Sequence, residues 1–388
     1  MEATTKNREA QFANWCAFVK PLGVDSSLQG EPFHIRTRCL SGFAALVRTG
    51  YFGRGNQVQS GTVSTALTAV GKTIALAYGE NPTKAVGSEK FLPRLQEMIA
   101  GWYKEDPATK KKLPVEVDVP ELLISESLRA GASEKAKAVG QSALIAYYYL
   151  LRNGEYTCKE YGSPDTQTEQ FRIKDVTFFR ISSQGKLYQV PRRARAFEFM
   201  TAQTATLRLG NQKNGWKNVC INQEHNGDDI FCPVRALAQR YCHIMKHTTD
   251  MDTLLSAYWE GDGNPTHVTD KDIRGYIKWA AERLNYPTER GIPIKLVDTH
   301  SLRIGGACSL ALAGYSETQI QKMGRWRGAT FKEYIREQLA CYSKGMSTSM
   351  KKVHSFVNIA GGADTDVPVD ITDTMMTMEF NTAAVAAQ

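Results

Sequence analysis

The first hundred residues carry apolar side chains at the three- and four-residue spacing of amphipathic helices. Phe12, Trp15 and Val19 fall on one face in this way, and Val63 and Leu67 begin a second such face. Turn-forming residues separate these stretches, with Gly and Asn between the second and third and a Gly-Glu-Asn-Pro sequence after the third. We therefore predict helices over residues 9–19, 34–47, 62–78 and 90–103.

A break in this pattern follows at residues 104–120. The stretch holds three prolines and a run of three lysines and has no helical periodicity. We interpret residues 107–121 as a linker and place a helical domain before it, over residues 1–106. The run of lysines could contact a phosphate backbone or act as a weak nuclear localisation signal, and a solvated hinge explains it equally well. These lysines are Lys110, Lys111 and Lys112.

The second part of the chain mixes helical and strand patterns. An apolar helix is predicted over residues 133–152 with Ser133 as its N-cap. Apolar and polar side chains alternate over residues 171–180, which predicts a strand there. Two further strands, 205–210 and 218–222, flank an Asn-Gly pair that indicates a hairpin. Helices are expected over residues 233–246, 271–284, 299–313, 317–323 and 329–339. The fold class is mainly α with a small β-sheet: a helical domain, then a mixed α+β domain over residues 122–345 and a flexible acidic tail over 346–388.

Charge is distributed unevenly along the chain. The 388 residues include 48 Lys and Arg against 40 Asp and Glu, a formal charge of +8. From residue 353 to the end there is no Lys or Arg but there are five acids, and removing these five from the total leaves +13 on residues 1–352. A basic body with an acidic tail fits a polyanionic partner such as nucleic acid, although charge that only confers solubility gives the same count.

Composition argues against a membrane or secreted protein. The longest apolar runs, such as residues 143–151, fall far short of the ~18–20 residues that span a bilayer, and the charged N-terminus is unlike a signal peptide. The eight cysteines are scattered without a Cys-x-x-Cys pair, which is typical of reduced thiols in the cytosol or nucleus. Cys242, His243 and His247 lack a second ligand pair, so we expect a helix face with half-buried imidazoles there and no metal.

One segment could carry anion chemistry. Asp298 or Thr299 can cap the helix that follows, and His300 and Arg303, three residues apart, share one face of its first turn. Backbone N–H groups also point outward at a helix start, so this arrangement suits an anion. Taken alone, this spacing is more typical of an ordinary structural helix than of an anion site.

The residues that follow make the pattern more specific. The helix ends at Gly314, a Gly324-Arg325-Trp326 turn comes next, and Tyr334 lies on the following helix. This order resembles the catalytic motif of the tyrosine recombinases, the phage-integrase and Cre-like superfamily. Its Gly-Arg-Trp sequence is most similar to the corresponding motif of mobile-element recombinases of the Crypton and DIRS type.

Features upstream match the same family pattern. Arg152 follows the apolar helix and Glu155 comes three residues later, while Lys213 lies in the predicted hairpin between the two arginine motifs. The resemblance covers about residues 125–343. It implies that residues 1–106 form a core-binding domain that clamps DNA, and that the second domain is catalytic.

The resemblance also implies a role for each matching residue. Tyr334 would attack a scissile phosphate, Arg152 and Arg303 would hold its oxygens, His300 would act as base or hydrogen-bond donor, Lys213 would protonate the leaving 5′-oxygen, and Trp326 would pack the site. Glu155 would brace an arginine. The arginines take the place of a metal, and no cofactor is implied.

Some assignments stay open at this point. Only eight positions separate Trp326 from Tyr334, one fewer than the family pattern has, so Arg325 could align in place of Trp326. Tyr342 is a rival nucleophile, and Lys217 could substitute for Lys213. Further candidates for DNA contact, each also explained by simple solvation, are Arg325, Arg327, Lys217, Lys110, Lys111 and Lys112.

The expected function is that of a site-specific DNA recombinase or integrase. Its partner would be double-stranded DNA, on which four copies assemble, with neither a membrane nor a small-molecule substrate involved. The location would be the nucleus in a eukaryote and otherwise the cytoplasm or nucleoid. Two alternatives remain: a DNA-binding protein derived from a mobile-element recombinase that has lost turnover, and an enzyme like type IB topoisomerases.

Overall fold

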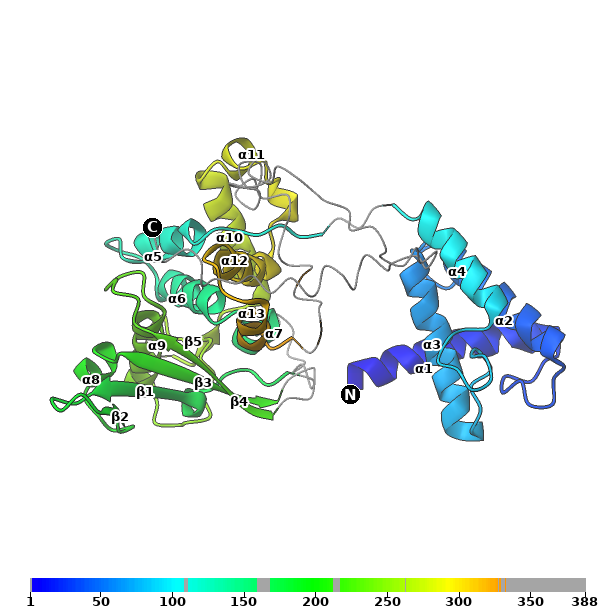
Figure 1. Ribbon diagram of the computed structural model, residues 1–388, viewed down its shortest axis with the longest axis horizontal. Helices are drawn as coiled ribbons and strands as arrows, with labels where there is room; N and C mark the ends of the chain where they lie inside the picture. Colours follow the sequence, from blue (N-terminus) through cyan, green and yellow to red (C-terminus); the bar gives the residue numbers. More distant parts are fainter. Residues whose placement is uncertain are drawn as a thin grey trace, which may run out of the picture. The chain divides into compact units, whose positions relative to one another are not determined.

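The computed structural model describes residues 2–107, 111–158, 168–211, 217–261, 263–326, 328 and 332 (Figure 1). The chain is mainly helical with a small antiparallel sheet, as the sequence predicted. Four helices form its first part, namely α1 (Glu2–Val19), α2 (Phe33–Thr49), α3 (Ser60–Tyr78) and α4 (Pro93–Glu105). The short 3-10 helix η1 (Lys20–Leu22) follows α1.

The first four helices enclose a hydrophobic core of their own. Trp15 is fully buried, its ring centroid lies 5.4 Å from that of Phe43 in an edge-to-face contact, and its indole N–H donates to the carbonyl of Ser26 at 2.7 Å. Helices α2 and α3 end at Gly50 and Gly79, which adopt the left-handed conformation typical of helix C-termini. All four helices predicted for this part are confirmed.

The rest of the described chain builds a second, larger core. Its helices are α5 (Asp118–Ser127), α6 (Glu134–Tyr148), α7 (Asn153–Tyr156), α8 (Ala196–Met200), α9 (Pro233–His247), α10 (Asp270–Arg283), α11 (Tyr286–Glu289), α12 (Thr299–Leu312) and α13 (Glu317–Gly324). Its strands are β1 (Val176–Ile181), β2 (Leu187–Gln189), β3 (Thr204–Asn211), β4 (Lys217–Glu224), β5 (Ala257–Tyr258) and β6 (Thr266–His267). The 3-10 helices η2 (Ile173–Asp175) and η3 (Ile294–Leu296) connect them.

The main sheet is antiparallel in the order β2-β1-β3-β4. Its β3–β4 hairpin was predicted, and the register pairs Leu207 with Ile221 and Asn211 with Lys217. Alternate residues of β3 are buried, and Phe178 of β1 meets Tyr241 of α9 at 5.5 Å between ring centroids. Helix α9 therefore covers one face of the sheet.

The expected linker overlaps this second core. Helix α5 begins at Asp118, inside the range predicted to be a linker, and Val115 is buried and donates its N–H to the carbonyl of Ser301 at 3.3 Å. The prolines obscured the helix start because Pro120 lies in the first turn of α5, where its missing N–H is tolerated. The proposed domain boundary itself stays a prediction.

Two other predicted elements differ in extent. Ser133 caps α6 as expected, its hydroxyl accepting from the N–H of Ala136 at 3.1 Å, but α6 ends at Tyr148 and not at residue 152. The cause is Leu150, whose φ of 48° turns the chain out of the helix. The strand predicted from residue 171 starts only at Val176 because η2 precedes it.

Candidate functional site

Helix α12 places His300 and Arg303 on adjoining turns. Asp298 caps the helix by accepting from the N–H of Thr299 at 2.8 Å, and the hydroxyl of Ser301 accepts from the N–H of Asp298 at 3.0 Å. His300 is half-buried, whereas Arg303 is 1% exposed. The cap fixes where the helix begins, and so fixes which side chains its first turns present.

Two glycines allow α12 to approach its neighbours closely. A Cβ on Gly305 would lie 1.9 Å from the carbonyl oxygen of Val115, and one on Gly306 would lie 2.4 Å from that of Tyr147. Backbone atoms cannot yield by that amount, so only glycine fits at either position. This close approach brings the side chain of Arg303 to the end of α6.

The turn after α6 supplies carbonyl acceptors for arginine side chains. Arg303 donates through Nη1 to the carbonyl of Leu150 and through Nη2 to that of Gly324. Arg325 donates to the same Leu150 oxygen at 3.1 Å and to the carbonyl of Tyr149 at 3.2 Å. The left-handed conformation of Leu150, which costs roughly 1–3 kcal/mol in a residue with a side chain, belongs to the turn that presents these carbonyls.

Arg325 is buried at the centre of this cluster. It terminates α13 with a φ of 59°, is 0% exposed, and its Nη2 lies 2.7 Å from Oε2 of Glu155, which is also 0% exposed. Burial lowers the pKa of the Arg325 guanidinium, and the Glu155 carboxylate opposes that effect. The expectation that Arg325 contacts DNA is wrong, because its guanidinium is enclosed by Glu155 and two backbone carbonyls.

Arg152 joins the same carboxylate from the other side. Its backbone N–H donates to Oε2 of Glu155 at 2.8 Å, and its Nη1 donates to Oε1 at 3.2 Å. Its Nη2 lies 3.4 Å from the carbonyl of Arg325. Arg152 and Arg303 thus donate to neighbouring carbonyls, those of residues 325 and 324, although 151 positions separate them in the sequence.

This group, Arg152, Arg303, Arg325 and Glu155, is called the arginine cluster below. It combines three guanidinium groups with one carboxylate, so its formal charge is positive. Arg152 is the most exposed of the four, with a quarter of its side chain accessible. The accessible guanidinium of Arg152 suits a phosphate oxygen, because guanidinium groups bind oxyanions through paired N–H donors, whereas those of Arg303 and Arg325 are buried and bonded within the protein.

Trp326 packs against the cluster. Its ring centroid lies 4.3 Å from the guanidinium carbon of Arg303, a distance that allows a cation–π contact. The ring covers Gly324 so closely that a Cβ there would lie 1.6 Å from a ring carbon. The Gly-x-Trp pattern thus has a steric origin, since the residue two before the tryptophan has room only for a hydrogen.

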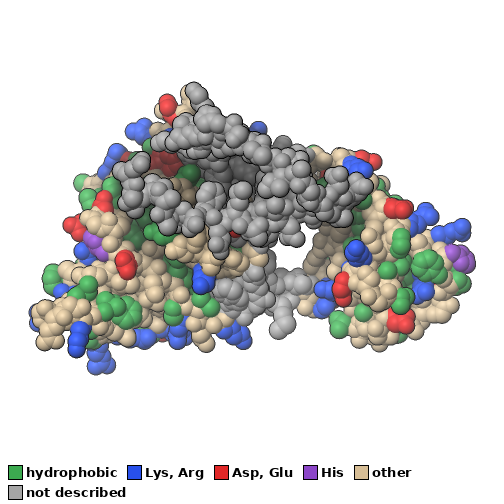
Figure 2. Space-filling model, in the orientation of Figure 1, with side chains coloured by type: hydrophobic (Ala, Val, Ile, Leu, Met, Phe, Trp, Pro, Cys, Tyr) green, Lys and Arg blue, Asp and Glu red, His purple; other side chains and the backbone are tan. Residues whose placement is uncertain are grey.

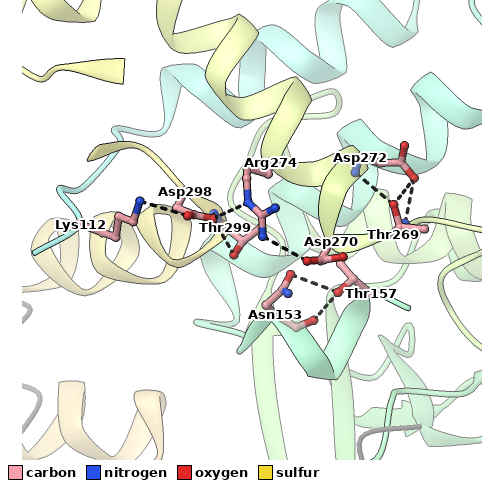
Figure 3. Close-up of polar contacts among 9 residues, drawn as sticks. All are labelled: Lys112, Asn153, Thr157, Thr269, Asp270, Asp272, Arg274, Asp298 and Thr299. Carbon is pink, nitrogen blue, oxygen red and sulfur yellow. Dashed lines mark hydrogen bonds and ion pairs between the residues drawn. The ribbon is translucent and has the colours of Figure 1, made fainter. Parts of the chain in front are cut away.

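A second polar network fixes the start of α12 (Figure 3). Oδ1 of Asp298 accepts from Nε of Arg274 at 3.0 Å, and Arg274 also bonds to Asp270 at 3.1 Å within α10. Lys112 lies 3.2 Å from Oδ2 of Asp298. Helix α12 is therefore tied both to α10 and to the segment before α5, and Lys112, a candidate for DNA contact, forms an ion pair within the protein.

Other predicted site residues are not part of the described cluster. Lys217 begins β4 and Lys111 precedes α5, and both are exposed. Tyr334, Lys213, Arg327, Lys110 and the rival nucleophile Tyr342 lie outside the described residues. Their roles stay predictions.

The histidines of α9 form an aromatic contact. His247 stacks on Trp259 with ring centroids 4.6 Å apart, and His243 lies near both rings. Burial lowers the pKa of His243 to about 4. Within the part of the chain that the structure describes, no three His, Cys, Asp or Glu side chains are grouped to hold a metal, and no helix there has the length and hydropathy needed to cross a membrane.

No protein-family model matches this sequence, and no curated protein does. Among solved structures, the chain is similar to the Tn1549 transposon integrase in complex with transposon right end DNA, at 12% identity and a TM-score of 0.41, over 81% of this chain and 84% of that one. It is also similar to the XerA recombinase, at 14% identity and a TM-score of 0.38, over 91% of this chain and 94% of that one.

A third similar structure is the XerH site-specific recombinase bound to its difH substrate, at 14% identity and a TM-score of 0.41, over 78% of this chain and 68% of that one. The solved structures named here are thus integrases and recombinases.

Sequence reasoning missed the pairing of Glu155 with Arg325. The two residues lie 170 positions apart, and nothing in the Gly-Arg-Trp-Arg wording distinguishes a buried arginine from an exposed one. The link from Arg274 to Asp298 was missed for the same reason. Each contact depends on how α10, α12 and α13 pack, which local sequence does not encode.

Replacing Glu155 by Ala tests whether the carboxylate holds the arginine cluster together. The change leaves Arg325 buried without its ion-pair partner, so the free energy of unfolding is expected to fall by about 3–5 kcal/mol. Urea unfolding followed by circular dichroism measures it. Glu282→Ala, at an exposed position of α10, is the control and should change stability by less than about 0.5 kcal/mol. Equal losses in the two variants would contradict the interpretation.

The pH dependence of stability tests the Asp298 network. Burial raises the pKa of Asp298, but hydrogen bonds from Arg274, the Thr299 N–H and Lys112 outweigh this, so the pKa is lower than usual. A lowered pKa contributes stability that is complete above the unfolded-state value of about 3.9 and is lost as pH falls through the folded-state value.

We therefore expect Asp298→Asn to have a lower free energy of unfolding than the unchanged chain at pH 7. This difference in unfolding free energy, called the gap below, should narrow as pH falls from about 5 towards 3. Urea unfolding at several pH values measures the gap. Glu282→Gln serves as the comparison, with a gap near zero throughout. A gap for Asp298→Asn that stays constant with pH would refute the assignment.

Proposed function

We propose that this chain is a site-specific DNA recombinase that cuts and rejoins DNA through a 3′-phosphotyrosyl intermediate. The observation that carries the proposal is the convergence of Arg152 and Arg303 on adjacent carbonyls, with Glu155 bracing the cluster. The two arginines come from separate sequence motifs, and the fold brings them together.

The arginines would stabilise charge on the phosphate. A phosphodiester is already anionic, and the charge on its non-bridging oxygens grows as a nucleophile attacks. Guanidinium groups remain protonated at neutral pH and present fixed N–H donors, so they stabilise that charge without reorganising. The bonds to backbone carbonyls and Glu155 support this role because they fix the orientation of each side chain.

Tyr334 would be the nucleophile. Its phenol oxygen forms a bond to the scissile phosphorus, the bond from phosphorus to the 5′-oxygen breaks, and the 3′ end stays attached to the protein. The phenol proton passes to a base, for which His300 is placed at the start of α12, and Lys213 supplies a proton to the 5′-oxygen. A 5′-hydroxyl can then reverse the step on a new strand, so no external energy source is needed.

The partner would be duplex DNA. The formal charge of +13 on residues 1–352 favours DNA because neutralised phosphates release counterions. The helical bundle α1–α4 would contribute to the clamp, and four copies would assemble so that each cuts one strand. Such an enzyme works where DNA is, in the nucleus of a eukaryote or in the nucleoid.

A covalent-adduct experiment tests the nucleophile. In a duplex nicked just to the 3′ side of the cleavage position, attack releases the short fragment that carries the free 5′-hydroxyl. This fragment dissociates, so the protein–DNA link is trapped. We expect the unchanged chain and Tyr342→Phe to form the adduct and Tyr334→Phe to form none, as measured by denaturing gel electrophoresis. If Tyr334→Phe forms the adduct and Tyr342→Phe does not, the nucleophile is Tyr342 and the assignment of Tyr334 is wrong.

DNA binding and plasmid relaxation, measured beside adduct formation, separate the alternatives. Tight binding of cognate DNA without any adduct from the unchanged chain would favour a DNA-binding protein that has lost turnover. Relaxation of supercoiled plasmid without a partner duplex would favour an enzyme like type IB topoisomerases. Either result would overturn the assignment as a recombinase.

Arg152 offers a test of phosphate stabilisation with a matched control. Arg152→Ala is expected to slow single-turnover cleavage roughly 10²–10³-fold, the usual effect of removing one preorganised donor. Arg172 is the control because its backbone N–H also donates to an acid three residues later, Asp175, while its guanidinium bonds to Asp252 at the surface. Arg172→Ala should cleave at nearly the rate of the unchanged chain, and equal effects would contradict the proposed role.

A further inference from the structure

A second basic region lies on the sheet, apart from the arginine cluster. Residues 176–197 contain no Asp or Glu and five cations, which are Arg180, Lys186, Arg192, Arg193 and Arg195. The first acid after this stretch is Glu198, whose carboxylate accepts from the backbone N–H of Arg195 at 3.0 Å. Every charged side chain in this stretch is therefore positive.

The fold gathers these cations on one surface. Arg180 of β1 pairs with Tyr188 of the edge strand β2, and its guanidinium carbon lies 5.7 Å from the ring centroid of Phe197 in α8. Arg192 donates to the carbonyl of Lys174 at 3.2 Å, which holds the connecting segment against the sheet. Arg180 lies on β1, Lys186 lies in the β1–β2 turn, and the other three cations lie in the segment between β2 and α8. We name this region the β1–β2–α8 surface.

The cations of this surface are not neutralised by ion pairs among the described residues, and Glu198 of α8 is its one acid. Within the described ranges, none of its five cations forms an ion pair. Lys186, Arg192, Arg193 and Arg195 are largely accessible to solvent. Arg192 and Arg193 also line a cavity of about 300 Å³ together with Lys246 of α9, which adds a sixth positive charge.

The surface lies away from the expected reaction centre. Strand β1 pairs with Thr204–Leu207, the first half of β3, so Ile181 and the β1–β2 turn lie beyond the start of β3. The β3–β4 turn is at the opposite end, about 24 Å away at 3.4 Å per residue. Figure 1 shows β2 and α8 on the far side of this part of the molecule from α7 and α13, and Figure 2 shows Lys and Arg side chains along that edge.

We propose that the β1–β2–α8 surface binds the phosphate backbone of duplex DNA, as a contact additional to that at the arginine cluster. Cations spread along β1, the β1–β2 turn and the segment between β2 and α8 match a repeating line of phosphates better than a single anion. Backbone contacts of this kind position a duplex without reading its sequence. The proposal relies on the proposed function only for the choice of DNA as the polyanion.

The experiment compares two variants that lose the same charge. The test variant carries Lys186→Gln, Arg192→Gln, Arg193→Gln and Arg195→Gln, and the control carries Arg129→Gln, Lys137→Gln, Lys278→Gln and Arg283→Gln on α6, α10 and the segment after α5. Fluorescence anisotropy gives the affinity for a labelled duplex at several salt concentrations. Urea unfolding checks that both variants are folded.

We expect the slope of log affinity against log salt to become shallower in the test variant only, by about 0.9 for each phosphate that its side chains no longer neutralise. Equal slopes in the two variants would overturn the proposal. So would a larger effect on single- or double-stranded RNA of the same length than on duplex DNA, which would assign the surface to RNA.

Cleavage by the unchanged chain separates this proposal from the proposed function. If the unchanged chain forms the Tyr334 adduct while the two variants bind DNA alike, only the additional surface is refuted. If the unchanged chain forms no adduct but the test variant loses salt-dependent binding, the surface stands and the recombinase assignment falls.

Discussion

The buried pair of Glu155 and Arg325 is the constraint on which the site depends. Removing both charges from water is costly, and the pair is stable only because every neighbour contributes. Glu155 also accepts from Arg152, and Arg325 also donates to the carbonyls of Tyr149 and Leu150. The end of α6, the end of α13 and the start of α7 therefore have to meet at one point, and that meeting fixes where Arg152 and Arg303 lie.

Close backbone contact makes this meeting possible, and glycine is what permits it. Gly305 and Gly306 let α12 touch the segment before α5 and the end of α6, while Gly324 makes room for the ring of Trp326. By contrast, Gly275 in α10 faces open space, where a side chain would fit. Gly305, Gly306 and Gly324 thus help to place the charged residues by allowing close packing, and they take no part in chemistry themselves.

The sequence predicted elements whose cause is local and missed contacts whose cause is tertiary. Apolar periodicity located the helices of the N-terminal bundle, and the Asn-Gly pair located the β3–β4 hairpin. The sequence offered Arg325 as a candidate for contact with DNA or solvent and gave no sign of its burial, because the partner that buries it is 170 positions away. Strand β2 and helix α8 were missed as well, since both are short and mostly exposed and leave no apolar repeat.

The arginine cluster and the β1–β2–α8 surface are two separate positive regions, and they could act together only if something links them. At physiological salt the screening length is about 8 Å, whereas β3 alone separates the β1–β2 end from the β3–β4 turn by roughly 24 Å. Their fields therefore do not reinforce each other directly. Any coupling has to pass through a ligand long enough to touch both, and a duplex that bends or wraps around the sheet has that length. A short duplex would engage one region at a time, so the length of DNA, and not its sequence alone, would govern how much of the positive surface is used.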